Sequence, residues 1–254
     1  STDYMLNPGF TTFPLFDFQG RSAVPSNIEI YSDAIRLYEG GINSGEYFLS
    51  DLPVRNGAGD VEVRVRDLTG NLQNLTVPYY ISPQLLKAGL NSYGIDFGLK
   101  REQFGRKSNA YKSLLFNSVY YHGITNYLTG GGYIQAYKKY IGAGGEGVFK
   151  IGNLGVLNAG ISFSKGGKLK NIVDGTKPER SFGSQYFIGY DYTGKRFGGS
   201  IRYTRNRDFA QLSTIGSKKL NGPAVQASLN YNSEALGSFS TTYTKVKSPN
   251  ISKL

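Results

Sequence analysis

The sequence predicts an all-β protein in which a small β-sandwich domain is followed by the antiparallel strands of a transmembrane β-barrel. Three observations lead to this fold class. Apolar and polar residues alternate with a period of two along many short segments. The links between the later segments alternate between short turns and long polar loops, as they do in an outer-membrane barrel. No apolar run approaches the roughly 18 residues that a transmembrane helix needs.

The clearest alternation lies in SQYFIGYDYTGKRFGGSIRYTR, which predicts a β-hairpin with one aromatic and branched face and one small or polar face. A soluble sheet would turn the apolar face toward a protein core, whereas a membrane barrel would turn it toward lipid. In the barrel interpretation the lipid-facing residues are Tyr186, Ile188, Tyr190, Tyr192, Ile201 and Tyr203. The residues expected to line a watery lumen are Lys150, from the preceding hairpin, and Asp191, Ser200, Arg202 and Thr204.

Charge divides the chain into two units. Residues 1–90 hold six Lys/Arg and ten Asp/Glu, and residues 91–254 hold 23 and eight, which gives net charges of −4 and +15. We expect a β-sandwich domain with an N-terminal lead-in segment over residues 1–82, and a partial transmembrane barrel of about nine strands over residues 83–254. Lys150 and Arg202 would either keep the lumen hydrated or pair with the acidic surface of the first unit.

The first unit is predicted to be a compact antiparallel domain. Its clearest strand is 60–67, where three valines face one way and Glu62, Arg64 and Arg66 face the other. Asp51 is expected to act structurally, by accepting backbone N–H bonds in a turn. The other strands are expected at residues 27–31, 34–38, 47–49 and 72–80.

The second unit is predicted to contain nine strands, at residues 92–100, 114–122, 133–140, 147–151, 156–164, 185–192, 197–205, 224–231 and 239–245. Its long loops are expected at 101–112, 165–183 and 206–223. GGGYIQA and GAGGEG lack the context of a phosphate loop and are interpreted as the start of a strand and a tight hairpin. Nine is an odd number, and an open sheet edge cannot stand in lipid, so a piece of a longer barrel is favoured.

Three stretches resemble the plug domain, and its return into the barrel, of outer-membrane ushers of the chaperone–usher pilus pathway. SGEYFLSDLPV is similar to the family's G-P-F-x-I-x-D-L stretch, with Glu46 where Pro is usual, and GAGDVEVRVRDLTG resembles its G-x-(L/V)-x-V-x-V-x-(D/E)-x-x-G run. The residues that carry this plug resemblance include Gly45, Tyr47, Leu49, Asp51, Leu52, Gly59, Asp67 and Gly70. ISPQLLKAGLNSYGIDFG resembles the return into the barrel through Ser82, Leu85, Leu86, Gly89, Tyr93 and Gly98.

The resemblance implies a function without covalent chemistry. It implies a pore, closed at rest by the plug, for the secretion and assembly of pilus subunits that a periplasmic chaperone delivers. The energy would come from strand exchange between subunits, a form of β-augmentation. The implied location is the bacterial outer membrane, with outer-membrane lipid around the barrel.

No residue pattern points to an enzyme. The chain has no Cys and a single His, His122, which has no Asp or Glu near it in sequence, so we expect no catalytic residue, no metal ligand and no cofactor. The basic half lacks a nucleic-acid-binding motif, and no nucleic-acid partner is expected. Two alternatives stay open, namely another outer-membrane pore of the porin or autotransporter type, and a soluble all-β carbohydrate- or nucleic-acid-binding protein whose tyrosine face is buried in protein.

Overall fold

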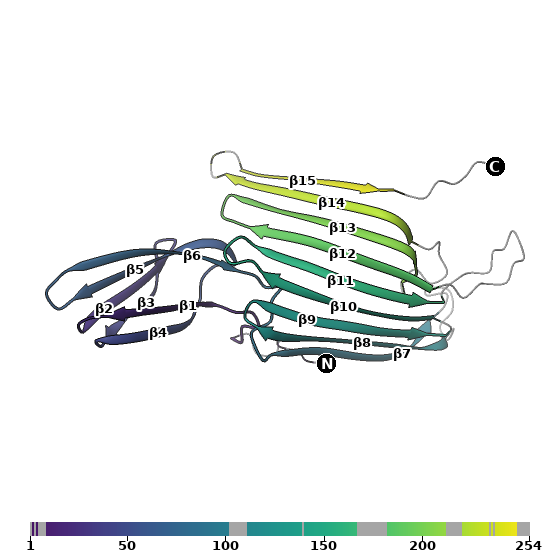
Figure 1. Cartoon of the computed structure of the whole chain (residues 1–254), viewed down its shortest axis with the longest axis horizontal. Helices are drawn as coiled ribbons and strands as arrows, with labels where there is room; N and C mark the ends of the chain where they lie inside the picture. The colour runs from purple at the N-terminus through teal and green to yellow at the C-terminus, as the bar shows by residue number, and fades with distance from the viewer. Residues whose placement is uncertain are drawn as a thin grey trace, which may run out of the picture.

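The computed structural model describes residues 2, 4, 9–101, 111–138, 140–166, 182–211, 220–233, 235 and 237–247. These residues form fifteen β-strands in three antiparallel sheets, which confirms the all-β prediction. Figure 1 shows two small sheets as one unit beside one end of a broad curved sheet. The long loops predicted at 101–112, 165–183 and 206–223 lie largely outside the described residues. In the described part of the chain, no helix is long and apolar enough to cross a membrane.

The first unit, Phe16–Ile81, is a sandwich of two sheets and is called the sandwich below. One sheet pairs β1 (Phe16–Ser22) with β4 (Gly45–Leu52), and the other has the order β3 (Ile35–Ile42), β2 (Ser26–Ser32), β5 (Gly57–Asp67) and β6 (Leu72–Ile81). Strand β1 was not predicted, because only Phe16 and Phe18 alternate before the polar stretch that ends it.

The core of the sandwich follows from the period of two in its strands. Ile28 and Ile30 of β2 and Val61 and Val63 of β5 are at most 1% exposed and pack against the two phenylalanines of β1. Burying each such side chain contributes about 1.5–3 kcal/mol. The opposite residues of β5, such as Arg64, face water, so the sandwich has a wet outer surface.

The large sheet, Asn91–Val246, is called the wall. Its nine strands are β7 (Asn91–Arg101), β8 (Tyr111–Thr125), β9 (Leu128–Tyr137), β10 (Tyr140–Lys150), β11 (Val156–Lys165), β12 (Phe182–Thr193), β13 (Phe197–Phe209), β14 (Leu220–Ser233) and β15 (Gly237–Val246). Each strand pairs with the next along the chain, and β7 and β15 are the edges of the described sheet. The turns β8–β9, β10–β11, β12–β13 and β14–β15 lie at one end of the wall, the turn end, where Figure 1 places the sandwich.

GAGGEG lies inside β10, so the tight hairpin predicted there is wrong, whereas GGGYIQA begins at the third residue of β9, close to the predicted strand start. The single strand predicted at 133–140 is also wrong, because the chain turns between Tyr137 and Tyr140, where Lys138 has a positive φ of 51°. The glycines make room for rings on the neighbouring strands. A Cβ at Gly131 would collide with the ring of Tyr121, and a Cβ at Gly144 would lie 2.7 Å from the ring of Tyr133.

Candidate functional site

The pairing register of the wall sorts its side chains onto two faces. Ile188 lies opposite Tyr203, and Tyr190 lies opposite Ile201, so alternating residues of β12 and β13 share one face. Ile188, in a strand inside the sheet, is 53% exposed, and Phe97, in the edge strand β7, is 71% exposed. This apolar face carries large exposed side chains from β7 to β15, among them Tyr93, Ile95, Phe97, Leu99, Leu114, Tyr120, Ile134, Phe149, Ile161, Tyr186, Ile188, Ile201, Leu229 and Tyr243.

The other face of the wall is polar, and its side chains bond to one another across strands. The hydrogen-bonded pairs are Tyr121–Glu146 at 2.5 Å, Asn158–Asp191 at 2.5 Å, Gln185–Asn206 at 2.6 Å and Ser200–Ser228 at 2.7 Å. Such pairs satisfy polar groups on a surface that water can reach. The wall is therefore a two-faced sheet, with large apolar side chains on one face and cross-strand polar pairs on the other.

The predicted lumen residues all lie on this polar face. Asp191 lies opposite Ser200, and Arg202 and Thr204 follow on the same side of β13. Among the described residues, no ion pair joins Arg202 or Lys150 to the acidic surface of the sandwich, a pairing that the sequence predicts as one possibility. The Arg202 guanidinium lies 3.9 Å from the centre of the Phe187 ring, and the Lys150 ammonium lies 5.8 Å from the centre of the Tyr127 ring. Arg202 therefore stacks on its own wall.

The predicted lipid-facing residues all share the apolar face by register, but the surroundings of Tyr192 differ from those of the others. Tyr192 is partly buried, and its ring stacks on Tyr80 of the sandwich with 5.9 Å between centroids. The prediction of lipid contact for Tyr192 is therefore corrected. The residue stands at the turn end of β12, where the sandwich covers it.

The contact between the sandwich and the turn end of the wall is called the seat. Its apolar part contains Tyr80 and Leu85, which pack with Val156 of β11. The hydroxyl of Tyr80 accepts a hydrogen bond from the Thr193 amide at 3.3 Å, and burial raises its pKa above the ordinary value. The Asn153 amide group donates to the Pro78 carbonyl at 3.0 Å. Three turns of the wall thus share the seat with the sandwich and the segment that follows it.

The segment after the sandwich, Ser82–Leu90, continues the seat. Leu85 is 1% exposed, and the Leu86 amide donates to the Thr129 hydroxyl at 2.7 Å. Gly89 has a positive φ of 83° and donates to the Gly123 carbonyl at 2.8 Å, which turns the chain into β7. Four residues of the predicted return segment, Ser82, Leu85, Leu86 and Gly89, therefore lie in this connection, while Tyr93 and Gly98 lie in β7.

Two ion pairs flank the seat. Lys195, in the β12–β13 turn, pairs with Asp33 of the sandwich, although the two are 162 residues apart. Asp51 of β4 pairs with Lys87 at 2.6 Å. The prediction that the Asp51 carboxylate accepts backbone N–H bonds is wrong, since its bond goes to an ammonium, while the Asp51 amide itself donates to Asp17 at 2.9 Å. Sequence reasoning missed Asp33 and Lys195, whose pairing has no local signal.

The role expected of Asp51 belongs to Asp67, in the turn between β5 and β6. Its carboxylate accepts from the backbone amides of Thr69 and Asn71, both at 2.9 Å, and from both of their side chains. These bonds favour the ionised form and lower the pKa of Asp67 from 3.8 to about 2. Gly70 completes the turn with a positive φ of 91°.

The remaining residues of the predicted plug motif have structural positions. Gly45 begins β4 with a positive φ of 116°, and Leu52 is 5% exposed in the core. Tyr47 and Leu49 are partly buried against that core. A Cβ at Gly59 would lie 2.5 Å from the Tyr79 hydroxyl, so this glycine lets the aromatic ring lie across the strand.

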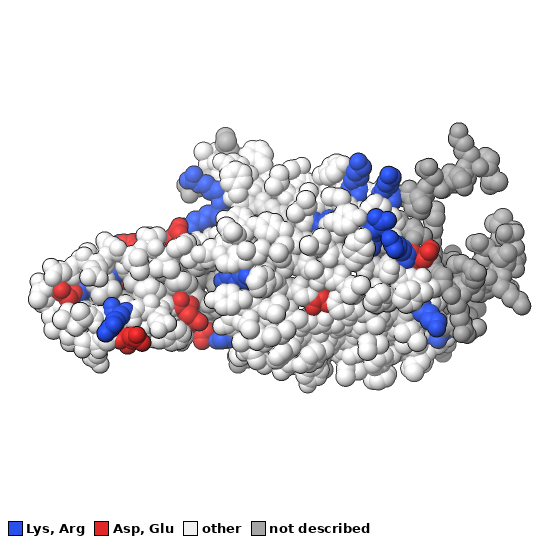
Figure 2. All heavy atoms as spheres, viewed as in Figure 1, with Lys and Arg blue, Asp and Glu red and all other residues white. Residues whose placement is uncertain are grey.

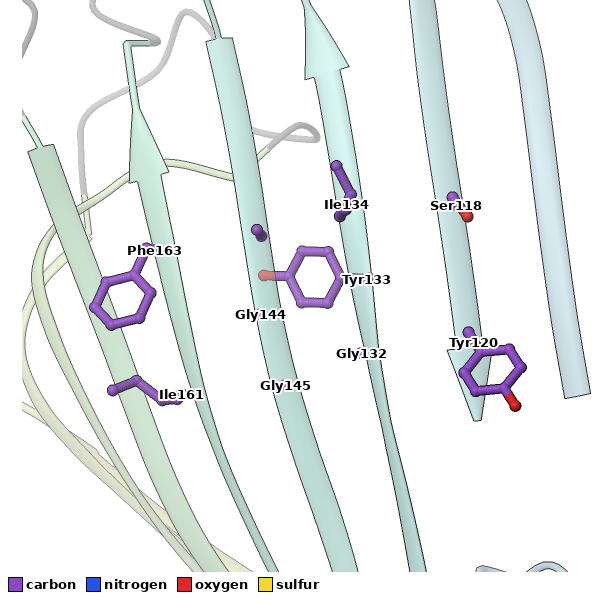
Figure 3. A pocket seen from close by; sticks show the side chains of 10 residues that line it. Ser118, Tyr120, Gly132, Tyr133, Ile134, Gly144, Gly145, Ile161 and Phe163 are labelled. Atoms are coloured by element: carbon purple, nitrogen blue, oxygen red, sulfur yellow. The ribbon is translucent and has the colours of Figure 1, made fainter. Parts of the chain in front are cut away.

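A shallow hollow of about 510 Å³ marks the apolar face (Figure 3). Ile161 and Phe163 of β11 border it on one side and Tyr120 of β8 on the other, over the glycines of β9 and β10. Within the described residues, no three His, Cys, Asp or Glu side chains gather where they could hold a metal ion.

A two-faced antiparallel wall with a small sandwich at its turn end defines the class of outer-membrane barrel proteins that carry an added domain. The family model described as outer membrane usher protein matches residues 19–245, which is most of the chain. The chain therefore belongs to the outer membrane usher protein family, and the resemblance found in the sequence is confirmed.

Curated relatives of the chain are also named as outer membrane usher proteins. The chain is similar to the outer membrane usher protein AggC of Escherichia coli, at 28% identity over 149 residues, which cover 58% of this chain and 17% of AggC. It is similar to the usher FimD of Salmonella typhimurium, at 23% identity over 194 residues, which cover 70% of this chain and 21% of FimD. The chain thus spans about a fifth of the length of these relatives.

The fold recurs among solved structures. One of them is the cryo-EM structure of the E. coli P pilus tip assembly intermediate PapC-PapD-PapK-PapG, to which this chain is similar with a TM-score of 0.63 and 17% identity. The match covers 99% of this chain and 31% of that one, so the combination of sandwich and partial wall recurs there.

The depressed pKa of Asp67 predicts an acid-sensitive turn. A carboxylate whose pKa is lowered on folding stabilises the fold above its unfolded pKa, and that contribution is lost as pH falls from about 4 to about 2. Asp67→Asn should remove this part of the pH dependence and expose the β5–β6 amides to exchange already at neutral pH. Pulsed hydrogen exchange on that turn in the detergent-purified full-length protein measures it. Asp60→Asn, an exposed carboxylate of β5, is the control, and equal pH profiles for both variants would contradict the assignment.

The seat predicts a charge-dependent position of the sandwich. Lys195→Glu should lower cross-linking between cysteines introduced at Pro78 and Asn153 by roughly two- to fivefold, because an exposed ion pair contributes at most ~1 kcal/mol. Adding Asp33→Lys should restore the yield by exchanging the charges. If the double variant cross-links no better than the single one, Lys195 acts through something other than Asp33.

Proposed function

We propose that the chain is the plug domain and the middle barrel strands of an usher, which forms the pore and plug for the secretion and assembly of pilus subunits delivered by a periplasmic chaperone. The observation that carries the proposal is the family match over residues 19–245 on a sheet with an exposed apolar face and a polar face. The apolar face would contact outer-membrane lipid, and the polar face would line the passage.

The polar face suits the passage of folded proteins. Many of its groups are already bonded to one another, as in the pair of Gln185 and Asn206 and the pair of Ser200 and Ser228, so these groups need no bond from a passing protein. Arg202 is held against Phe187. A lining of this kind is hydrated and has few groups that would bind a passing subunit strongly. Such a surface favours the movement of a subunit along it over the retention of that subunit.

The sandwich would act as the plug. Its seat joins it to the turn end of the wall through one small apolar cluster, several hydrogen bonds and the Lys195–Asp33 pair. Exposed pairs and small clusters contribute modestly to stability, so a seat of this kind can be formed and released. The mechanism uses no covalent step, and strand exchange between successive subunits would supply the energy.

Two observations disfavour the alternatives that the sequence left open, namely a soluble all-β binding protein and an outer-membrane pore of the porin or autotransporter type. A soluble sheet protein would bury the Tyr186 and Ile188 face, yet these residues are 42% and 53% exposed in the described wall. A porin or autotransporter would not account for a family match that includes the sandwich, from residue 19 onward.

Two substitutions on neighbouring residue pairs test the proposal in the full-length protein. Ile188→Lys places a charge on the apolar face, at a cost of ~2–4 kcal/mol in the bilayer midplane, and should abolish heat-modifiable mobility, recovery in the outer membrane and pili on the cell surface. Thr204→Lys lies one pair away on the polar face and should keep membrane insertion.

Cells that lack the gene should hold subunits in the periplasm until the wild-type gene is returned. Normal surface pili with Ile188→Lys, or in cells without the gene, would refute the proposal.

A further inference from the structure

A basic pocket lies where the sandwich meets the turn end of the wall. It encloses about 810 Å³ and is lined by Asp33 and Arg55 of the sandwich, by Lys195 and Arg196 of the β12–β13 turn, and by Tyr231 and Asn232 at the end of β14. Figure 2 shows Lys and Arg gathered where the wall adjoins the sandwich. Its residues come from three separate parts of the chain, so the pocket exists only in the folded protein.

The charges in the pocket are unbalanced. Asp33 is the one carboxylate among its described lining residues, and it is already paired with Lys195. Among the described residues, no ion pair joins Arg55 or Arg196 to a carboxylate, and both side chains are exposed. Within the described residues, the two guanidinium groups at the pocket therefore have no carboxylate partner. Guanidinium groups bind phosphate and carboxylate oxygens through paired hydrogen bonds.

The pocket also lies at a defined level of the wall. The rings of Tyr231 and Phe197 pack against each other in a tilted arrangement on the apolar face, with 4.8 Å between centroids, and Phe197 is 63% exposed. Immediately beyond these two rings the chain becomes polar, at Arg196 and Asn232. The Asn232 backbone amide donates a hydrogen bond to the Arg196 carbonyl at 2.8 Å. Aromatic rings at the border between apolar and polar surface mark the level of lipid head groups.

We propose that the basic pocket binds the phosphate of an anionic phospholipid head group, with Arg55 and Arg196 as the phosphate ligands and the acyl chains along the apolar face beside Tyr231. This proposal rests on the proposed function, because it needs the apolar face to lie in lipid. A lipid so bound would touch both the sandwich and the wall, and would add a membrane-dependent contact to the seat.

A lipid is favoured over an acidic protein segment because the basic pocket is continuous with the apolar face of the wall. The pocket adjoins the exposed aromatic pair of Tyr231 and Phe197, so a ligand with a phosphate and long apolar chains would contact both kinds of surface at once. An acidic peptide would use the arginines and leave the rings exposed. Basic side chains near an anionic membrane surface each contribute roughly a fivefold gain in binding.

The test is native mass spectrometry of the full-length protein in detergent with added phosphatidylglycerol, and with phosphatidylcholine of the same acyl chains. Phosphatidylglycerol should bind preferentially, and Arg55→Gln with Arg196→Gln should weaken that binding by ~5-fold each. Arg21→Gln with Arg66→Gln, two exposed arginines of the sandwich outside the pocket, is the matched control. Equal binding of the two lipids, or equal loss in the control, would overturn the proposal.

A second readout separates this proposal from the one it rests on. A fluorophore on a cysteine at position 188 should be quenched by lipids brominated in the acyl chain, whatever their head group. Quenching without a preference for phosphatidylglycerol would overturn the pocket assignment and leave the proposed function standing. No quenching would overturn both. If the arginine variants keep lipid binding and lose an acidic peptide that the wild-type protein binds, the pocket is a protein interface and the lipid assignment is wrong.

Discussion

The whole arrangement depends on backbone pairing in a sheet whose side chains alternate strictly between two faces. In lipid, every backbone N–H and C=O must find a partner within the protein, and a β-sheet provides this while leaving one face free to be apolar. The register of β12 with β13 shows the consequence, since Ile188 and Tyr203 share one face while Asp191 and Ser200 share the other. A shift of one residue would exchange the faces.

The sandwich adds a second constraint at the turn end. Its own core of Ile28, Ile30, Val61 and Val63 is independent of the wall, whereas its position relies on the few contacts of the seat. A domain with its own core and few contacts to its neighbour can change position without unfolding. The same geometry brings Arg55 and Arg196 to one basic pocket, so the proposed lipid contact would link the membrane to the position of the sandwich.

Local periodicity predicted most of the wall and part of the sandwich. Strands β11 to β13 were found because Leu157, Ile161, Tyr186 and similar residues alternate with small polar ones. Strands β9 and β10 were misplaced, since glycines on both faces remove the alternation. Contacts between distant residues could not be predicted. The stacking of Tyr192 on Tyr80 and the Lys195–Asp33 pair join segments more than 100 residues apart, and no local pattern encodes them.

The central claim is that the apolar face of the wall contacts lipid and the polar face contacts water. The chain has no cysteine, so single cysteines can be placed at position 188 on one face and at position 204 on the other, in neighbouring residue pairs. In a full-length protein with no other free cysteine, held in intact outer membranes, a water-soluble maleimide should label position 204 readily and position 188 hardly at all. Equal labelling of the two positions, or the reverse order, would contradict the account.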